Sequence, residues 1–226
     1  GQQGRVQTRV QRVDHRVERR NGVVRLDHRR RVGQHHRHGR AARHAEAVFI
    51  GGNDKAAVRQ TVQELREQVV KAGRRADDLK IVLGVTVVPA ATQQEARDKH
   101  DEYLRHASPE AGLAHFSSSA GLDLSRYGLD EPIEFGQTNA IQSTVRVIQQ
   151  LGGTRRKLLE HFRLGGRYPA IVGDGNQVAD ELQSWVDETG IDGFNITRTV
   201  VPESFEDVVD FVVPELQNRG RYKTAY

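Results

Sequence analysis

The 226-residue chain contains no cysteine and no methionine, and it has only one tryptophan. Without cysteine there is no disulfide framework, no thiolate-ligated metal centre and no catalytic thiol. No apolar run approaches the roughly 20 residues that a transmembrane helix needs, and no apolar signal core follows the first residue. We therefore expect a cytoplasmic protein without a membrane partner. The chain begins at Gly1 rather than at a methionine, as we expect of a fragment.

Positive charge is confined to the first forty residues. They hold 12 arginines against three acidic residues, a net charge of +9, whereas residues 41–226 hold 22 basic and 27 acidic residues, a net charge of −5. Such an asymmetry is typical of a basic arm attached to a separate folded body. The length of the remaining part is sufficient for a globular domain with a proper core.

Residues 1–40 lack Ala, Lys, Ile, Phe, Tyr, Trp, Ser and Pro, and no apolar face persists in them. Three interpretations are open: a disordered arm that binds nucleic-acid phosphates, a metal-binding tract at His35, His36 and His38, or a stretch outside the native reading frame. The abrupt change near Ala41 favours the third interpretation. Nucleic-acid binding is further disfavoured because the arm has no aromatic residue on which a base would stack.

From residue 41 onward the sequence predicts regular elements. Residues 45–50 indicate a strand, and Asp54 begins a helix that ends near residue 72. Residues 81–88 (IVLGVTVV) lack alternation and predict a strand that is covered on both faces, ended by Pro89. A capping-box pattern then begins a helix over 92–107. The apolar positions of the first helix share one face: Val58, Val62, Leu65 and Val69.

Residues 108–153 differ from their surroundings, because they carry two prolines, three consecutive serines and six glycines with little apolar periodicity. A stretch of this length and composition is typical of a functional or flexible insertion. A short helix over 140–151 is predicted within it. Asn139 and Gln142 are the candidate polar residues for a pocket here, although an ordinary helix start is the simpler explanation.

The last third again alternates strands with amphipathic helices. We expect a helix over 154–164, a strand over 170–173, a helix capped by Asp174, and a strand over 193–196. Such alternation implies right-handed βα units and a parallel sheet, but three or four strands are too few to close a barrel. The final helix opens at Ser204, and Pro214 should kink or shorten its end. Its expected inward residues are Phe205, Val208, Val209, Val212 and Leu216.

Motifs with their own chemistry are scarce. The phosphate-loop, dinucleotide-binding, nucleophile-elbow and zinc-protease patterns are all absent from the sequence. Residues 173–176 (GDGN) precede a helix whose N-terminus would attract an anion, but the carboxylate of Asp174 would repel phosphate, so a capped turn is the simpler explanation. His100, His106, His115 and His161 lack metal-ligand spacing, and we take them as surface residues. We expect no metal site, and no catalytic residue can be assigned.

Several longer stretches carry a family resemblance, and their order and spacing make it specific. Residues 41–226 resemble the C-terminal part of the bacterial-luciferase-like flavin monooxygenases. The most similar group contains nitrilotriacetate monooxygenase component A, dibenzothiophene sulfone monooxygenase and the pristinamycin synthase subunit. The stretches are Ala41–Ile50 (AARHAEAVFI), Gly121–Ile133 (GLDLSRYGLDEPI), Thr138–Ser143 (TNAIQS), Gln177–Ile196 and Val201–Tyr226.

The resemblance implies an α/β protein that is a partial (β/α)₈ barrel, with about strands six to eight and their helices, one insertion over about 108–153, and no N-terminal half. It implies a monooxygenase that uses O₂ and reduced FMN supplied by a separate flavin reductase, and acts on a small organic compound, often containing sulfur or nitrogen. The full-length protein would be a homo-oligomer. A deazaflavin-dependent oxidoreductase of the same superfamily is the alternative.

The sequence also departs from the family pattern. The phosphate-binding turn that normally precedes residue 41 contains serine, whereas residues 33–39 contain none, and residues 173–176 replace the usual Gly-Ser/Thr-Pro-Glu. No cofactor-binding or catalytic residue is therefore carried over, and Asn139 and Gln142 remain the only substrate-side candidates. A partial barrel leaves strand edges and an apolar interior face unpaired. We expect the isolated chain to be unstable, to self-associate or to be inactive.

Overall fold

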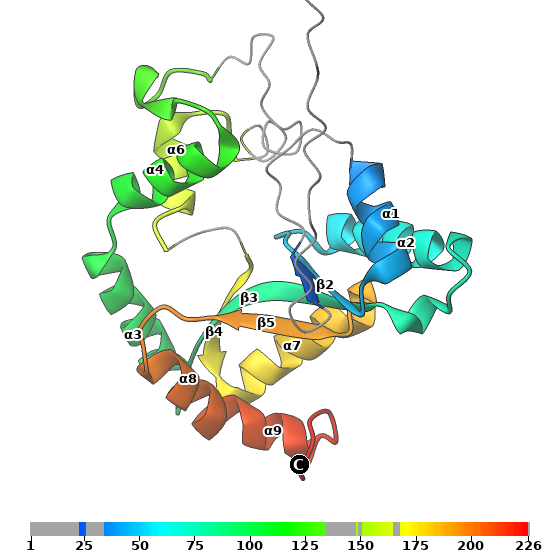
Figure 1. Cartoon of the computed structure of the whole chain (residues 1–226). Coiled ribbons are helices and arrows are strands. Elements are labelled where there is room, and N and C mark those ends of the chain that lie inside the picture. Colours follow the sequence, from blue (N-terminus) through cyan, green and yellow to red (C-terminus); the bar gives the residue numbers. More distant parts are fainter. Residues whose placement is uncertain (1–22, 26–33, 134–147, 149–150, 165–167, 226) are drawn as a thin grey trace, which may run out of the picture.

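The computed structural model describes residues 23–25, 34–133, 148, 151–164 and 168–225. One parallel sheet forms its centre (Figure 1). Every strand pair in this sheet is parallel, as the alternation of strands and helices predicted. The strands are β1 (Val23–Arg25), β2 (Ala47–Ile50), β3 (Lys80–Ala90), β4 (Ala170–Asp174) and β5 (Gly193–Thr197).

Strand β3 is the central strand of the sheet. Its Val82 pairs with Phe49 of β2 and also with Gly193 of β5, so β2 and β5 lie on opposite edges. Strands β1, β2, β3 and β5 are therefore neighbours in chain order, as consecutive strands of a (β/α)₈ barrel are. Thr86 pairs with Ala170 of β4 on one side and with Thr197 of β5 on the other. Strand β4 therefore lies on the same edge of β3 as β2, beyond the end of β2. The described residues thus form a partial barrel.

Pro89 does not end the central strand, which continues to Ala90; that prediction was wrong. The backbone N–H groups of Lys80 and Thr86 point to the β2 and β4 edge. By alternation the missing N–H of Pro89 faces the other edge, where β5 pairs only as far as Thr86. The proline therefore costs the sheet no ladder hydrogen bond.

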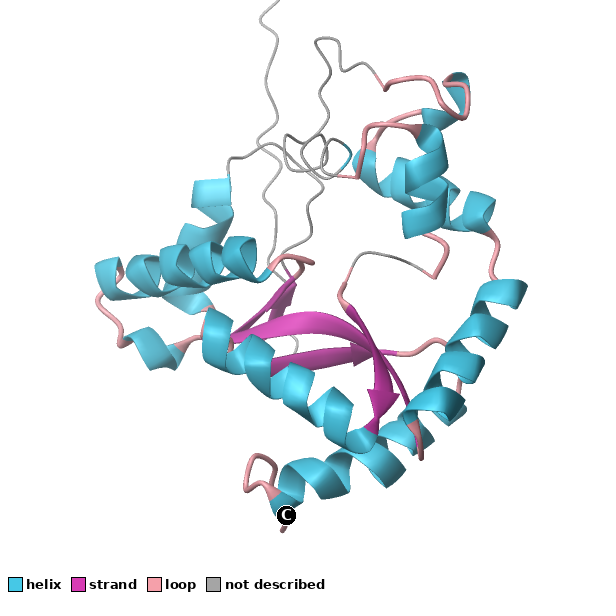
Figure 2. Cartoon of the chain, turned by 180° about the vertical axis from the view of Figure 1, so that it is seen from behind, coloured by secondary structure: helices cyan, strands magenta, loops and turns pink. Residues whose placement is uncertain are grey.

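Helices cover one face of the sheet. They are α2 (Lys55–Lys71), α7 (Gly175–Thr189) and a C-terminal helix made of α8 (Glu203–Asp207), the π-helical turn η3 (Val208–Val212) and α9 (Val213–Asn218). Figures 1 and 2 show α7 and α9 running beneath the strands on the same side. The four apolar residues predicted for α2 are all buried there, together with Val178, Leu182 and Trp185 of α7 and Val208 and Val212 of η3.

Three of the predicted helix starts are confirmed, at Asp54, Thr92 and Asp174. The carboxylate of Asp54 accepts a hydrogen bond from the Ala57 N–H at 2.7 Å and caps α2. Capping boxes begin α3 (Gln93–His106) at Thr92 and α7 at Asp174. Each cap satisfies a backbone N–H that the first helical turn leaves without a partner. Local sequence therefore fixes where these helices begin.

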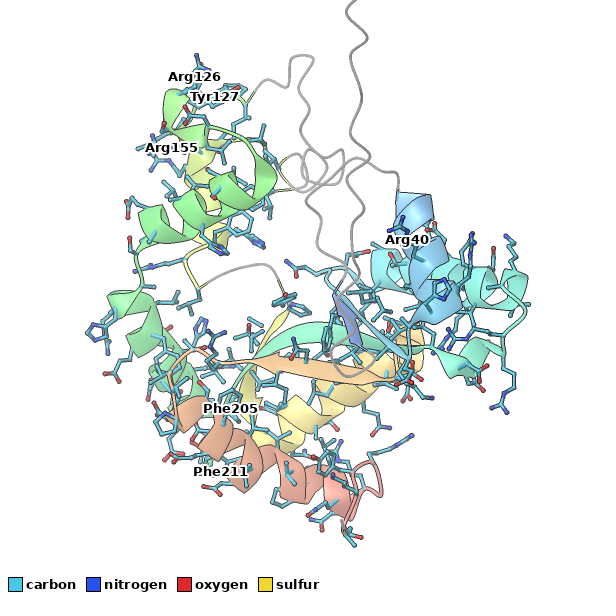
Figure 3. All side chains as sticks on the ribbon, in the orientation of Figure 1. Arg40, Arg126, Tyr127, Arg155, Phe205 and Phe211 are labelled. Carbon is cyan, nitrogen blue, oxygen red and sulfur yellow. The ribbon has the colours of Figure 1, made fainter. Side chains whose placement is uncertain are left out.

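The C-terminal helix differs from the prediction in which residues it buries. Phe205 and Val209 were expected to face inward, but they are 46% and 60% exposed; Figure 3 labels Phe205 on α8. Ser204, Val208 and Val212 are buried at four-residue spacing, and this places the following positions on a neighbouring face. Pro214 was expected to kink or shorten the end of the helix; it directly follows a π-helical turn and lies in the first turn of α9, which continues to Asn218.

A second, smaller core lies in the segment between β3 and β4. Helix α3 leads away from the sheet to α4 (Pro109–Ala120), the 3₁₀ turn η2 (Leu124–Arg126) and α6 (Arg155–His161) (Figure 1). Figure 3 shows Arg126, Tyr127 and Arg155 together at its far end, where Arg155 donates to the Tyr127 carbonyl at 3.3 Å. The buried residues of this core are Leu113, Leu124, Ile133, Ile148, Leu158 and Phe162.

The inserted segment is more regular than its composition indicated, because helix α4 was not predicted. Ser108 caps α4 through the Ala111 N–H and Pro109 occupies its first turn, a recognised start signal. Asn139 and Gln142 lie outside the described residues, as does most of the predicted helix over 140–151.

Near the N-terminus the structure describes β1 and α1 (Gln34–His44), and α1 crosses the proposed boundary between residues 40 and 41. The division of the chain at that boundary stays a prediction. Within the described ranges, none of the helices combines the length and the apolar character that crossing a bilayer requires.

Candidate functional site

The strand register separates two faces of the sheet. Leu83 and Val85 of β3, like the flanking Ile81 and Val87, point into the helix-covered core and are at most 2% exposed. The alternate residues Val82, Gly84 and Thr86 point to the other face, which would be the interior of a closed barrel. Register places these partners on that interior face: Phe49 beside Val82, Asn195 beside Gly84, and Thr197 and Ala170 beside Thr86.

Two threonine hydroxyls meet on the interior face. The Oγ1 atoms of Thr86 and Thr197 are 2.7 Å apart, and Thr197 Oγ1 donates to the Val85 carbonyl at 3.1 Å. Since Thr197 uses its proton on that carbonyl, Thr86 is the donor within the pair. Thr197 is the last residue of β5, so the pair lies toward the carboxyl ends of the strands. Active sites of (β/α)₈ barrels lie at this end.

The ring of Tyr168 lies on the same face. A methyl group placed on Gly84 would overlap with this ring, and one on Gly51 would lie 3.4 Å from its Cε1. The position of the tyrosine is set by β4, because the next residue, Pro169, accepts a hydrogen bond from the Thr86 N–H at 2.9 Å. Gly84 of β3 and Gly51, which directly follows β2, thus form a flat floor under one aromatic ring.

A histidine at the end of α6 reaches the rim of this face. His161 Nε2 lies 3.4 Å from Asn53 Nδ2, in the loop that follows β2. The histidine ring packs edge-on against Phe162, which stacks on Phe116 with ring centroids 4.1 Å apart. His161 was expected at the surface without a role; the structure instead uses it to connect the small core of the insertion to the carboxyl end of β2.

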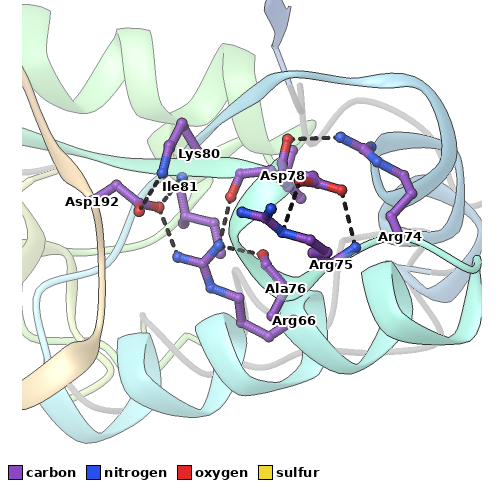
Figure 4. Close-up of polar contacts among 9 residues, drawn as sticks. Arg66, Arg74, Arg75, Ala76, Asp78, Lys80, Ile81 and Asp192 are labelled. Atoms are coloured by element: carbon purple, nitrogen blue, oxygen red, sulfur yellow. Dashed lines mark hydrogen bonds and ion pairs between the residues drawn. The ribbon is translucent and has the colours of Figure 1, made fainter.

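The opposite, amino-terminal end of the sheet is held by charge. Asp192 Oδ2 accepts from the Ile81 N–H and from Arg66 Nη2, both at 2.7 Å, and Lys80 Nζ lies 3.5 Å from Oδ1 (Figure 4). Arg66 also donates to the carbonyls of Ala76 and Leu79. Arg66 and the Ile81 N–H both have acceptors in this network. The network therefore joins α2 and the start of β5 to β3, and we give it a structural role.

A second ionic cluster joins α3 to α8. Lys99 Nζ lies 2.7 Å from Asp207 and 3.2 Å from Glu203, and Tyr103 donates to Glu203 at 3.1 Å. Burial lowers the pKa of Lys99, but its hydrogen bonds to the two carboxylates outweigh this and leave the pKa raised. Burial and the neighbouring Glu203 raise the pKa of Tyr103. A tyrosine with a raised pKa keeps its proton at neutral pH and does not act as a base. We therefore give this cluster a structural role, joining α3 to α8.

The N-terminus of α7 does not form an anion site. The carboxylate of Asp174 occupies it as a cap, and a methyl group on Gly175 would overlap with the Phe211 carbonyl of η3. Arg219 pairs instead with Asp180 at 2.6 Å and with Glu215 at 2.7 Å. The capped turn is thus the correct interpretation of residues 173–176. Across the described ranges, no three His, Asp or Glu residues are grouped as metal ligands.

The residues that the structure brings together at this site are Thr86, Thr197 and Tyr168, none of which sequence analysis singled out. Asn139 and Gln142, the predicted candidates, lie outside the described residues and stay candidates. One signal was present in the sequence: Gly84 interrupts an otherwise apolar β-branched run, and a glycine within a strand marks close approach of another group.

A half-barrel of parallel βα units, with a polar and glycine-bearing interior at the carboxyl ends of its strands, defines a class of (β/α)₈ proteins. Residues 36–193 match the model of the family described as luciferase-like monooxygenase. The match covers well over half of the chain, so the chain belongs to this family, as its resemblance indicated.

Curated relatives include the dimethyl-sulfide monooxygenase of Hyphomicrobium sulfonivorans, 35% identical over 190 residues, and the long-chain alkane monooxygenase of Geobacillus thermodenitrificans, 36% identical over 186 residues. Each match covers 82% of this chain, and 40% and 39% of the relative. The crystal structure of DmoA from H. sulfonivorans superposes with a TM-score of 0.74 at 36% identity, covering 84% of this chain and 41% of that one.

A solved riboflavin lyase with modified FMN and its substrate riboflavin is also similar, with a TM-score of 0.73 at 30% identity, over 84% of this chain and 42% of that one. The chain therefore spans about two fifths of the length of the relatives that it matches. What these complete proteins do comes to this chain only as a proposal.

Proposed function

We propose that this chain is the carboxyl-terminal part of a flavin-dependent monooxygenase that uses reduced FMN and O₂. A separate flavin reductase would supply the reduced flavin, and the substrate would be a small organic compound, with sulfur- or nitrogen-containing molecules the preferred class. The complete enzyme would be a homo-oligomer. The observation that carries this proposal is the family match over residues 36–193.

The names of the curated relatives support an oxygenation reaction. They include monooxygenases acting on dimethyl sulfide, nitrilotriacetate and dibenzothiophene sulfone, at 32–35% identity. These substrates share little beyond being organic and, in two cases, containing sulfur. The relatives therefore support the reaction class more strongly than any particular substrate.

The described residues fit one part of a flavin and not another. Val82 and Phe49 make the interior face apolar, as a planar ring requires, whereas the space directly over Gly51 and Gly84 is taken by the Tyr168 ring. A phosphate group finds no cradle at α7, because the Asp174 carboxylate caps that helix. When bound, the flavin would supply the oxygen chemistry, and the protein would orient the substrate and exclude water. We assign no residue of this chain to the phosphate.

A chimera tests the proposal. Residues 36–226 of this chain replace the matching segment of the H. sulfonivorans dimethyl-sulfide monooxygenase, which keeps its own preceding part. With a flavin reductase, NADH and FMN, we expect O₂ uptake in excess of the uncoupled reductase and formation of an oxygenated product. The matched control is the same chimera without reductase, supplied with oxidised FMN only, which should form no product.

The 226-residue chain alone provides the second arm. Since most of a barrel is missing from it, we expect no tight, saturable FMN binding in a fluorescence titration. Tight binding by this chain would contradict the view that it is an incomplete flavoenzyme. A chimera that folds, by circular dichroism, but forms no product with reduced flavin would contradict the proposed reaction.

A further inference from the structure

The interior face carries a feature that the flavin chemistry does not require, namely an aromatic side chain lying flat on two glycines. We propose that the Tyr168 ring occupies a binding space for a small planar apolar molecule, and that Tyr168 decides the size of that space. That this space receives the organic substrate rests on the proposed function; that the space exists does not.

The floor of the space is built by register. Phe49 pairs with Val82 and Ile50 with Leu83, so extending β2 by one residue places Gly51 beside Gly84. Both glycines lack the side chain that would otherwise project to the interior, and both approach the Tyr168 ring. Any other residue at Gly84 would displace the ring. The two strands have therefore left room for a group that comes from elsewhere in the chain.

The surroundings suit an apolar ring with one polar end. Val82 and the Thr86–Thr197 hydroxyl pair flank Gly84 along β3 and β5, and Asn195 is the neighbour of Gly84 across the sheet. Apolar walls with a few fixed polar groups are the usual composition of small-molecule sites. Such a wall would accept a phenol-like ligand as readily as the phenol of a tyrosine.

Tyr168 reaches this floor from the connection between α6 and β4 and not from a strand of the sheet. It lies two residues before β4, and β4 is fixed to the carboxyl half of β3 by pairing from Thr86 to Ala90. The side chain is half-buried, so it is not locked into either core of the molecule. A residue that lies outside the strands can change in size without disturbing the sheet, which is what a size-determining residue needs.

Replacement and chemical rescue test this inference in the full 226-residue chain. Tyr168→Ala removes the ring and should lower the Tm by about 6 °C. p-Cresol, which is the tyrosine side chain as a free molecule, should then bind in the vacated space, as small aromatics bind in apolar cavities left by truncation. At tenfold excess over its Kd it should raise the Tm by about 4 °C.

Three variants make the result specific. Tyr168→Val leaves a smaller space, and we expect p-cresol to bind it at least tenfold more weakly than Tyr168→Ala. Tyr168→Phe keeps the ring and should show no rescue. Tyr103→Ala, a truncated tyrosine on α3 away from the sheet, is the matched control and should also show none.

Equal rescue of the Tyr168 and Tyr103 variants, or no rescue of either alanine or valine at Tyr168, would overturn the inference. If Tyr168→Ala does not fold, Tyr168→Val decides the question alone, with saturable rescue as the supporting result. Flavin takes no part in this measurement. A failure here therefore leaves the monooxygenase proposal intact, and a failure of the chimera leaves the site on the interior face intact.

Discussion

Alternate residues of β3 serve two faces of one sheet, and the two faces differ in chemistry. On the helix-covered face, Leu83 and Val85 are fully buried among apolar side chains of α2 and α7. On the interior face, Gly84 and Thr86 are small or polar and meet Tyr168, Thr197 and an exposed asparagine. The helix-covered face therefore serves stability, whereas the interior face offers small and polar groups that can contact a ligand.

The same contrast runs along the strand. At the amino-terminal end of β3, the Asp192 carboxylate accepts hydrogen bonds from the Ile81 N–H and Arg66 and forms an ion pair with Lys80. Toward its carboxyl end, the Thr86–Thr197 hydroxyl pair and the Thr197 bond to the Val85 carbonyl join β3 to β5, and the Asn53–His161 contact adds a link to α6. In (β/α)₈ barrels the amino-terminal end serves stability and the carboxyl-terminal end serves chemistry. The partial barrel retains this polarity.

The largest expected effect separates the two faces directly. Leu83→Ala removes a fully buried side chain and should cost about 3 kcal/mol of unfolding free energy, through lost burial and a residual cavity. Val82→Ala, the adjacent residue on the interior face, is half-buried and should cost about 1 kcal/mol. Urea unfolding of the two variants measures the difference. Equal losses would mean that the interior face is as much a core as the helix-covered face.

A second effect concerns the two ends of the strand. Asp192→Ala leaves Arg66 and the Ile81 N–H without their shared acceptor, and should cost about 2 kcal/mol. Asp187→Ala on α7 is the control, because Asp187 is exposed and makes one long contact, to Gln183 at 3.4 Å; it should change stability by less than about 0.5 kcal/mol. If both variants lose the same unfolding free energy, the network at the amino-terminal end does not stabilise the protein as its geometry indicates.

The helix-covered face was predictable from the sequence, whereas the interior face was not. Period-3.6 spacing identified the buried residues of α2, and capping patterns located Thr92 and Asp174, because these signals are local. The interior cluster joins Thr86, Tyr168 and Thr197, which are up to 111 residues apart in the chain. No local pattern connects them, and only the register of a parallel sheet brings them together.

Two errors had local causes as well. Pro89 was judged by its missing donor, without knowledge that β5 ends before it. Phe205 was judged by hydrophobicity, although the helix buries the residues spaced from Ser204. In both cases the deciding fact was the position of another strand or helix.

The smallest expected effect concerns helix α3. Ionic contacts with Asp207 and Glu203 join it to α8, and the prediction tests whether these contacts contribute to stability. In the unfolded chain, Tyr103 and Lys99 lose their protons near their ordinary pKa values of about 10 and 10.4. Both pKa values are raised in the folded protein. The folded state therefore binds more protons above pH 10, and stability falls as pH rises through this range.

Tyr103→Phe and Lys99→Met each remove one of these protons, so the loss of stability between pH 8 and pH 11 should be smaller in each variant, by up to about 1 kcal/mol. Lys71→Met is the control, because Lys71 is 66% exposed and pairs only with Glu67 of its own helix among the described residues. The measurement is urea unfolding at the two pH values, compared as a difference, because Lys99→Met also leaves two carboxylates without their cation at every pH. An unchanged difference in both variants would mean that α3 is held by its packing and not by this cluster, and the division between a structural face and a contact face would then stop at the sheet.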